Sequence, residues 1–166
     1  MKISQSTIQE VVAQRTLALV GVSRGGKKFG NAIYRELKAK GYRVFPVHPQ
    51  AEKIENDPCY SSLKALPEKP GAVVICVPPV QAERVVQQSF EAGITKVWLQ
   101  QGAESDAALR FCKNHEMTAV HGQCIMMFAE PVGSFHSFHR WIWKLIGRYP
   151  SASPHHSAQT DEESAS

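Results

Sequence analysis

The sequence lacks a long apolar run, and this shortage argues against a membrane-spanning helix. Its longest unbroken apolar run covers residues 72–77, whereas a helix needs roughly 20 such residues to cross a bilayer. Residues 1–12 also lack the basic cap and continuous apolar core of a signal peptide. We therefore expect a protein without a transmembrane segment that works in the cytoplasm.

Cysteine is scarce, and no charge of one sign dominates the chain. The four cysteines are dispersed, and one of them, Cys76, lies inside an apolar segment where a disulfide partner is hard to supply, so reduced thiols are expected. Lys and Arg number 19 against 15 Asp and Glu, a formal charge of +4. Because the basic residues do not gather into a long stripe, nucleic-acid binding is not predicted.

Short apolar segments alternate with amphipathic ones along residues 1–130. The predicted strands cover residues 17–20, 43–47, 73–77, 96–99 and 118–120. The predicted helices cover residues 3–14, 80–92 and 105–115, with one more between Gly30 and Gly41. Thr7 with Glu10 forms the predicted capping pair of the first helix, and Ser105 caps the last. This alternation predicts an α/β fold of the Rossmann-like, three-layer type, with helices on both faces of a parallel five-stranded sheet.

After residue 130 the pattern becomes aromatic and basic. Residues 131–149 predict an appended helix with an apolar stripe. In order of preference, that stripe would cover the domain itself, a second copy in a homodimer or another partner, or a membrane surface. Residues 150–166 have no apolar periodicity and predict a disordered tail.

A glycine-rich turn with three cations follows the first predicted strand. It runs over residues 21–30 and contains Arg24, Lys27 and Lys28. Glycines let a backbone approach a phosphate closely, and the helix that follows offers unpaired N–H groups at its N-terminus. The turn therefore predicts a phosphate-bearing nucleotide ligand, the alternative being a tight turn with solvated lysines.

Two familiar nucleotide-binding motifs fail in this turn. Residues 21–27 match G-x4-G-K, but Lys28 stands where an NTPase needs Ser or Thr to hold magnesium. The dinucleotide fingerprint G-x-G-x-x-G is broken because Ser23 replaces its second glycine. The second predicted strand ends at His48 and Pro49, where a dinucleotide enzyme presents an acid for the ribose hydroxyls. These departures argue against ATP hydrolysis and against simple NAD binding.

Several motifs, taken in order, resemble the CoA-binding domain family. They are Gly21-x-Ser23 with Gly30, GYRVFPVHP at residues 41–49, Pro78-Pro79, WLQQG at residues 98–102, and Cys124. The resemblance covers residues 16–124 and extends to the N-terminal domain of the succinyl-CoA synthetase alpha subunit. It implies a site for CoA or an acyl-CoA at the carboxyl ends of the parallel strands. The implied ligand contacts are Gly21, Ser23, Arg24, Lys28, Gly30, His48, Lys53, Val77, Pro78, Pro79, Gln101 and Cys124.

The sequence departs from that family in two places. His48 stands where asparagine is usual, and Gly122 with Gln123 replaces a common charged pair. The synthetase also needs a second domain with a phosphorylated histidine, which we do not find in these residues. No Ser/His/Asp set or close carboxylate pair converges either. We therefore expect a non-catalytic CoA-binding protein.

Two other functions stay open from the residues. An NAD(P)-dependent oxidoreductase or redox sensor would use the same turn, and an acyltransferase or thiol enzyme would use Cys124 as its nucleophile. The pairs Cys112 with His115 and His121 with Cys124 have the residue types of a zinc site. Because a predicted strand separates the two pairs, no metal is expected. Cys124 is equally well explained as a small buried residue.

Overall fold

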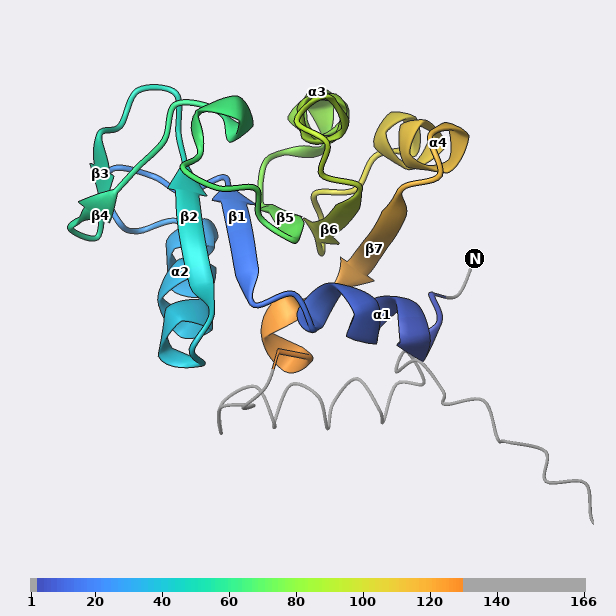
Figure 1. The fold of residues 1–166 in the computed structure, drawn as a ribbon, viewed down its shortest axis with the longest axis horizontal. Coiled ribbons are helices and arrows are strands. Elements are labelled where there is room, and N and C mark those ends of the chain that lie inside the picture. The colour runs from blue at the N-terminus through green and yellow to red at the C-terminus, as the bar shows by residue number, and fades with distance from the viewer. Residues whose placement is uncertain (1–2, 130–166) are drawn as a thin grey trace, which may run out of the picture.

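A parallel five-stranded sheet organises the chain, and the computed structural model describes residues 3–129 around it (Figure 1). The strands are β1 (Thr16–Val20), β2 (Arg43–Val47), β5 (Ala72–Ile75), β6 (Lys96–Gln100) and β7 (Thr118–Gln123). They lie in the order β2-β1-β5-β6-β7, and every neighbouring pair is parallel. The predicted Rossmann-like α/β fold is confirmed. Without the separate strands β3 and β4, the strand order is 2-1-3-4-5, one of the two common orders of doubly wound sheets.

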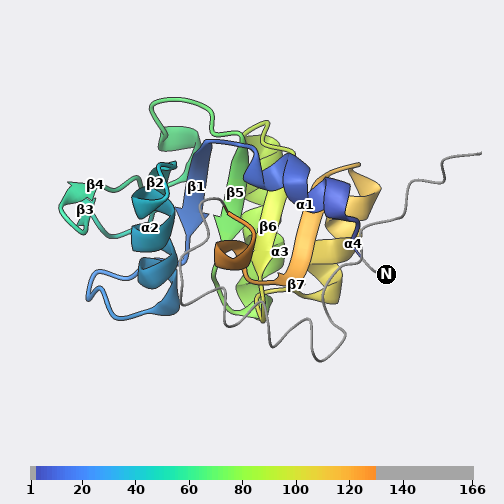
Figure 2. The same cartoon turned by 90° about the horizontal axis from the view of Figure 1, so that it is seen from below.

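Helices cover both faces of this sheet. The α-helices are α1 (Gln5–Val12), α2 (Phe29–Ala39), α3 (Pro79–Glu91) and α4 (Asp106–Asn114). On one face α1 and α2 pack with the short 3-10 helix η2 (Ile125–Met127), and Figure 2 shows these three in front of the sheet. On the other face lie α3 and α4. Within β1, Leu17 and Leu19 enter the first core and Ala18 enters the second. Because both faces of the sheet are buried at its centre, β1 and β5 are apolar runs, whereas the edge strand β7 is mixed.

A two-stranded hairpin interrupts the alternation between β2 and β5. Its strands, β3 (Lys53–Ile54) and β4 (Asp57–Pro58), are antiparallel, and the 3-10 helix η1 (Leu63–Ala65) follows them. The turn residues Glu55 and Asn56 have φ angles of 50° and 70°. Neither the hairpin nor η1 is predicted from the sequence, because two-residue strands are too short to show a periodicity.

Acidic residues fix the hairpin to α2. Asp57 pairs with Lys38 and accepts a hydrogen bond from the Tyr34 hydroxyl at 2.6 Å. Glu55 pairs with Arg35 at 2.6 Å. The hydrogen bonds from Lys38 and Tyr34 lower the pKa of Asp57, while burial and the bond to Asp57 raise the pKa of Tyr34. The hairpin is thus held beside the helix that follows the glycine-rich turn.

The predicted N-terminal cap is confirmed for α4 and wrong for α1. Ser4 caps α1, its hydroxyl accepting the Thr7 N–H at 3.1 Å. The predicted cap of Thr7 with Glu10 is therefore wrong, because the helix begins at Gln5 and encloses Thr7 in its first turn. Ser105 caps α4 as predicted, accepting the N–H of Ala108 at 3.2 Å.

No helix within residues 3–129 has the length and apolar character needed to cross a membrane. The predicted appended helix over residues 131–149 and the predicted tail over residues 150–166 lie outside the described residues. The same holds for a homodimer or partner contact through that helix.

Candidate ligand-binding groove at the strand ends

The chain leaves the centre of the sheet in opposite directions from β1 and β5. From β1 it crosses through α2 to β2 on one side, and from β5 it continues through α3 to β6 on the other side. Such a reversal opens a crevice at the carboxyl ends of the two central strands, where ligands of doubly wound sheets bind. Two adjoining clefts lie at this point.

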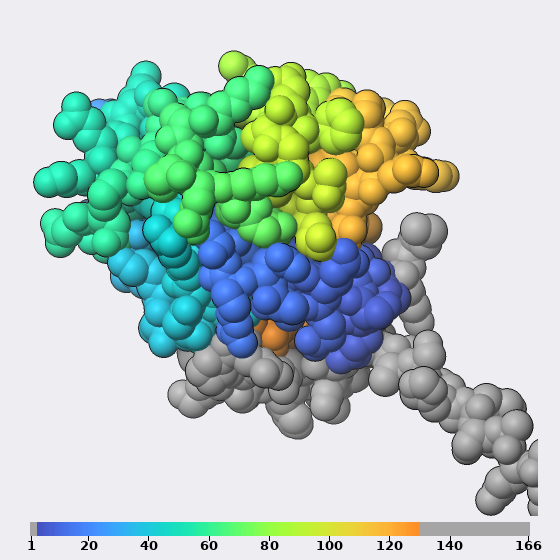
Figure 3. Space-filling model, viewed as in Figure 1, coloured from blue at the N-terminus to red at the C-terminus, as the bar shows by residue number. Residues whose placement is uncertain are grey.

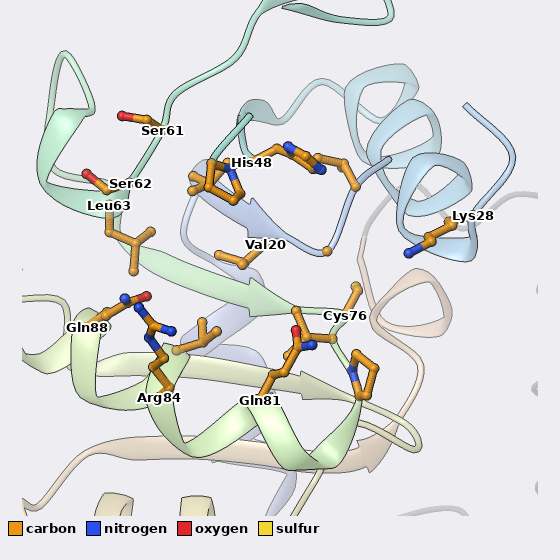
Figure 4. Close-up of a pocket in the computed structure, with 17 residues that line it drawn as sticks. Val20, Lys28, His48, Ser61, Ser62, Leu63, Cys76, Gln81, Arg84 and Gln88 are labelled. Atoms are coloured by element: carbon orange, nitrogen blue, oxygen red, sulfur yellow. The ribbon is translucent and has the colours of Figure 1, made fainter. Parts of the chain in front are cut away.

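The larger hollow, the main cleft, has a volume of about 500 Å³, within the range of small-molecule sites. Its floor is apolar and comes from the ends of β1, β2 and β5. One wall is the segment of residues 61–63, and the other is α3, from which Gln81, Arg84 and Gln88 face the cleft (Figure 4). In the space-filling view the chain between β4 and β5, in green, lies against the yellow-green α3 region (Figure 3).

A second hollow, the side cleft, has a volume of about 340 Å³ and adjoins the first. Residues 28–30 at the start of α2 and residues 100–103 after β6 line it. Both clefts are lined by Gly21, Lys28, Cys76, Val77 and Pro78. The two clefts therefore form one continuous groove across the strand ends.

Gly21 and Gly30 let the turn, the sheet and α2 approach one another closely. A Cβ atom on Gly30 would lie 2.4 Å from the Gly21 carbonyl oxygen, and one on Gly21 would lie 2.5 Å from the Cys76 carbonyl group. Gly21 also has a φ of +114°, which favours glycine. Backbone packing thus requires both glycines, and it brings the N-terminus of α2 against the groove.

Asn31 fixes the shape of the glycine-rich turn from inside. Its side chain is fully buried, and its Oδ1 accepts both the N–H and the hydroxyl of Ser23, at 2.9 and 3.1 Å. Its Nδ2 donates to the Ser23 carbonyl at 3.0 Å and to Glu55 at 3.4 Å. Glu55 belongs to the hairpin, so the hairpin and the turn share one hydrogen-bond network. Ser23 is therefore an anchor of the turn, with its N–H already occupied.

Two helices begin at the groove without a side-chain cap. Lys28 is the N-cap residue of α2 and Pro78 that of α3, and neither side chain accepts a hydrogen bond from its helix. By contrast, Ser4 and Ser105 cap α1 and α4. At the start of α2, backbone N–H groups are available to an anion, and the helix dipole adds positive potential there. The start of α3 offers less, because Pro78 and Pro79 have no N–H and the Gln81 N–H donates to the Pro78 carbonyl.

The groove carries basic side chains and no acidic ones. Lys28 and Arg84 line it, and neither has an acidic partner in the part of the chain that the structure describes. His48 accepts the N–H of Gln50 at Nδ1, at 3.1 Å, so its neutral ring carries the proton on Nε2. Within residues 3–129, no Asp or Glu lines either cleft. The groove therefore favours an anionic ligand.

The two cysteines near the groove are held in the thiol form. Burial raises the pKa of Cys76 to about 12, and the nearby Cys124 adds to this rise. Burial also raises the pKa of Cys124, against the opposing effect of a hydrogen bond with the Gln100 side chain. The thiolate is the nucleophilic form of cysteine. These shifts weigh against an acyltransferase that uses Cys124.

The candidate zinc residues do not converge. Cys112 is buried in α4, and His115 stacks on Phe111 where that helix ends. His121 lies in β7 and Cys124 directly after it. Among residues 3–129 there is no group of three or more His, Cys, Asp or Glu that could hold a metal ion.

Most of the residues singled out by the sequence line the groove. These are Gly21, Lys28, Gly30, His48, Val77, Pro78 and Gln101. Ser23, Arg24 and Pro79 lie in the same turn or helix start but line neither cleft. Lys53 lies exposed on the hairpin, and Cys124, which hydrogen-bonds with the Gln100 side chain, lines neither cleft. The structure does not bring these last two to the groove.

The sequence reasoning missed the polar wall that α3 contributes. Gln81, Arg84 and Gln88 are spaced by three and four residues, and so lie on one face of the helix. A polar stripe at this spacing, on a helix that starts at a strand end, is the signal that could have found them. On its own that stripe has the composition of a solvated helix face.

A family model described as a CoA binding domain matches residues 15–130. The chain is also 29% identical over 89 residues to an ADP-forming acetate–CoA ligase II of Archaeoglobus fulgidus, a match that covers 52% of this chain and 13% of the ligase. It is 29% identical over 84 residues to the alpha subunit of an ADP-forming acetate–CoA ligase II of Pyrococcus furiosus, covering 50% of this chain and 18% of the subunit. The chain therefore spans less than a fifth of the length of these curated relatives.

Solved structures of small proteins share the fold over most of their length. A conserved hypothetical protein of Pyrococcus furiosus is 40% identical with a TM-score of 0.64, over 67% of this chain and 96% of that chain. A hypothetical protein of Pyrococcus horikoshii is 27% identical with a TM-score of 0.72, over 78% of this chain and 92% of that one. The fold thus also occurs as nearly the whole of a solved chain.

Proposed function

The chain belongs to the CoA-binding domain family, and from this premise we propose that its groove binds coenzyme A or an acyl-CoA. One observation carries the proposal. The uncapped start of α2 lies beside an apolar floor with two cations, Lys28 and Arg84, that have no acidic partner within residues 3–129. In CoA, a 5′-diphosphate links an adenosine 3′-phosphate to a pantetheine chain. Its adenine and pantetheine need apolar surface, and its phosphates need positive charge.

The two clefts suggest how the ligand would lie. The diphosphate would sit at the start of α2, where the helix N–H groups and Lys28 supply positive charge. The adenosine would occupy the main cleft between His48 and α3. The pantetheine chain would follow the side cleft past Gln101. This arrangement uses the whole groove.

We propose further that the domain binds its ligand without catalysing a reaction. No carboxylate lines the groove within the described residues, and burial keeps Cys76 protonated. General acid–base or nucleophilic catalysis would need such a group within reach of the ligand. The role that fits is a carrier or sensor of CoA that acts through a partner.

Calorimetry with CoA, acetyl-CoA and NAD tests the proposal directly. We expect both CoA and acetyl-CoA to bind and NAD not to bind under the same conditions. Binding of NAD without binding of CoA would refute the proposal and favour the oxidoreductase or redox-sensor hypothesis. Turnover of acetyl-CoA during the titration would refute the non-catalytic part alone.

Replacing Lys28 with alanine should weaken CoA binding by up to about fivefold, because an exposed ion pair contributes up to about 1 kcal/mol. The effect should shrink as salt is added, since the charge is solvent-exposed. Lys113→Ala, on the exposed end of α4, is the matched control. Equal affinities for wild type and Lys28→Ala at low salt would remove Lys28 from the proposed site.

A further inference from the structure

The main cleft contains a second cation at the end away from Lys28. Arg84 extends from α3 into the cleft, and Figure 4 shows the apolar floor at Val20 lying between the two side chains. Arg84 has no acidic partner among residues 3–129. A guanidinium group in a cleft to which none of the described residues contributes a carboxylate favours an anion, and its planar fork matches phosphate oxygens.

Lys28 and Arg84 lie on opposite sides of the floor at Val20 (Figure 4), so each calls for an anionic group of its own. A diphosphate held at the start of α2 stays at the Lys28 end of the cleft, because the free N–H groups of that helix lie there. The Arg84 end needs a second anion, on the far side of the nucleoside from the first. In CoA that second anion is the phosphate on the 3′-oxygen of the ribose.

We propose that Arg84 recognises this 3′-phosphate, so that the groove selects CoA over nucleotides that lack it. The inference rests on the proposed binding of CoA in the groove. Gln88 follows Arg84 by one helical turn, and Ser62 lies on the opposite wall, so further hydrogen-bond donors surround the same end of the cleft. The chemical class selected is a nucleoside 3′-phosphate that also carries a 5′-diphosphate.

Other cations are placed less well for this task. Lys53, which the family resemblance implies as a contact, lies exposed on the β3–β4 hairpin and lines neither cleft. Arg24 and Lys27 belong to the glycine-rich turn and line neither cleft. Arg84 is the basic residue that α3 itself adds to the main cleft.

The test compares CoA with 3′-dephospho-CoA, which has the same adenine, diphosphate and pantetheine. Calorimetry on the wild-type chain should show CoA binding about tenfold or more tightly, the size of a charge-assisted hydrogen bond. In Arg84→Gln the ratio of the two affinities should fall to near one, and the affinity for 3′-dephospho-CoA should stay unchanged. Arg110→Gln, on the exposed surface of α4 and outside both clefts, is the matched control and should keep the preference.

Three results would overturn the inference. An equal loss of affinity for both ligands in Arg84→Gln would mean that Arg84 contacts a part that they share, such as the adenine. A preference that survives in Arg84→Gln but vanishes in Lys53→Gln would assign the 3′-phosphate to the hairpin. Failure of the wild-type chain to bind either ligand would refute the proposed function as well, which the first two results would leave standing.

Discussion

Individual residues of the glycine-rich turn build its shape before any ligand arrives. The sequence reasoning assigned Gly21, Ser23 and Gly30 to phosphate contact. In the structure Ser23 is hydrogen-bonded to Asn31. At Gly21 and Gly30 neighbouring backbone atoms occupy the space that a Cβ atom would need. Gly21 and Gly30 still line the groove, and the polar groups that the turn offers there are the start of α2 and Lys28. The turn is therefore a scaffold for a helix N-terminus.

Gly30→Ala should destabilise the fold and weaken CoA binding together. The added Cβ would lie 2.4 Å from the Gly21 carbonyl oxygen, a backbone atom that cannot rotate away. Relief requires a shift of α2 from the sheet, at a cost of roughly 1–3 kcal/mol. Chemical denaturation gives the change in unfolding free energy, and calorimetry gives the change in CoA affinity.

Gly25→Ala is the matched control for that substitution. No atom lies within 4 Å of its added Cβ, and its φ is not in the left-handed region. It should leave stability unchanged or raise it by about 0.4–1 kcal/mol, through the lower entropy of the unfolded chain. If Gly25→Ala and Gly30→Ala were equally stable, close packing of α2 on the turn would not be the reason for a glycine at position 30.

At the scale of elements, the hairpin and α2 act as one unit. Asp57 and Glu55 connect the hairpin to Lys38, Tyr34 and Arg35 on the helix. Through Asn31 the same network reaches the turn at the groove. The hairpin, which the sequence periodicity does not predict, thus supports the helix whose start faces the groove.

Asp57→Asn should remove a contribution to stability that depends on pH. Lys38 and Tyr34 lower the pKa of Asp57 in the folded chain, so the ionised carboxylate stabilises the fold above the ordinary aspartate pKa. That contribution is lost as the pH falls through the lowered folded-state value, below about pH 4. Denaturation curves at pH 7 and pH 3 should therefore show wild type and Asp57→Asn differing more at pH 7.

The comparison needs a carboxylate whose ion pair is more exposed than that of Asp57 with Lys38. Glu68 pairs with Arg43 at 3.0 Å, and their side chains are 41% and 61% exposed. Glu68→Gln should change stability by less than about 1 kcal/mol at either pH. The difference in unfolding free energy between wild type and Asp57→Asn could instead stay constant from pH 7 to pH 3. That result would show that the ionised form of Asp57 does not hold the hairpin.

The regular elements could be predicted because their signals are local. Three of the strands are short apolar runs that are followed by Gly21, Pro49 or Pro78. Ser105 is a typical N-cap residue and predicts the start of α4. The hairpin and the α3 wall could not be predicted in the same way. Two-residue strands have no periodicity, and Arg84 acquires a possible role only when the fold carries α3 across from His48. Long-range placement, which local pattern does not encode, decides which polar residues meet.

The whole molecule consists of two halves that meet at β1 and β5. One half contains β1, α2 and β2, and the other contains β5, β6 and β7 with α3 and α4. The groove takes its lining from both, including Lys28 from the first half and Arg84 and Gln101 from the second. A ligand that fills the groove therefore bridges the two halves.

Hydrogen exchange with and without CoA tests that bridging. Exchange should slow in residues 21–30, 76–81 and 100–103, by up to about a hundredfold when free CoA is about 100 times its Kd. Residues 113–117, at the end of α4 and away from the groove, serve as the internal control and should not change. Protection of residues 21–30 alone would place the ligand on the β1–α2 half, because a ligand lying across the groove must also hold the start of α3 and the loop after β6.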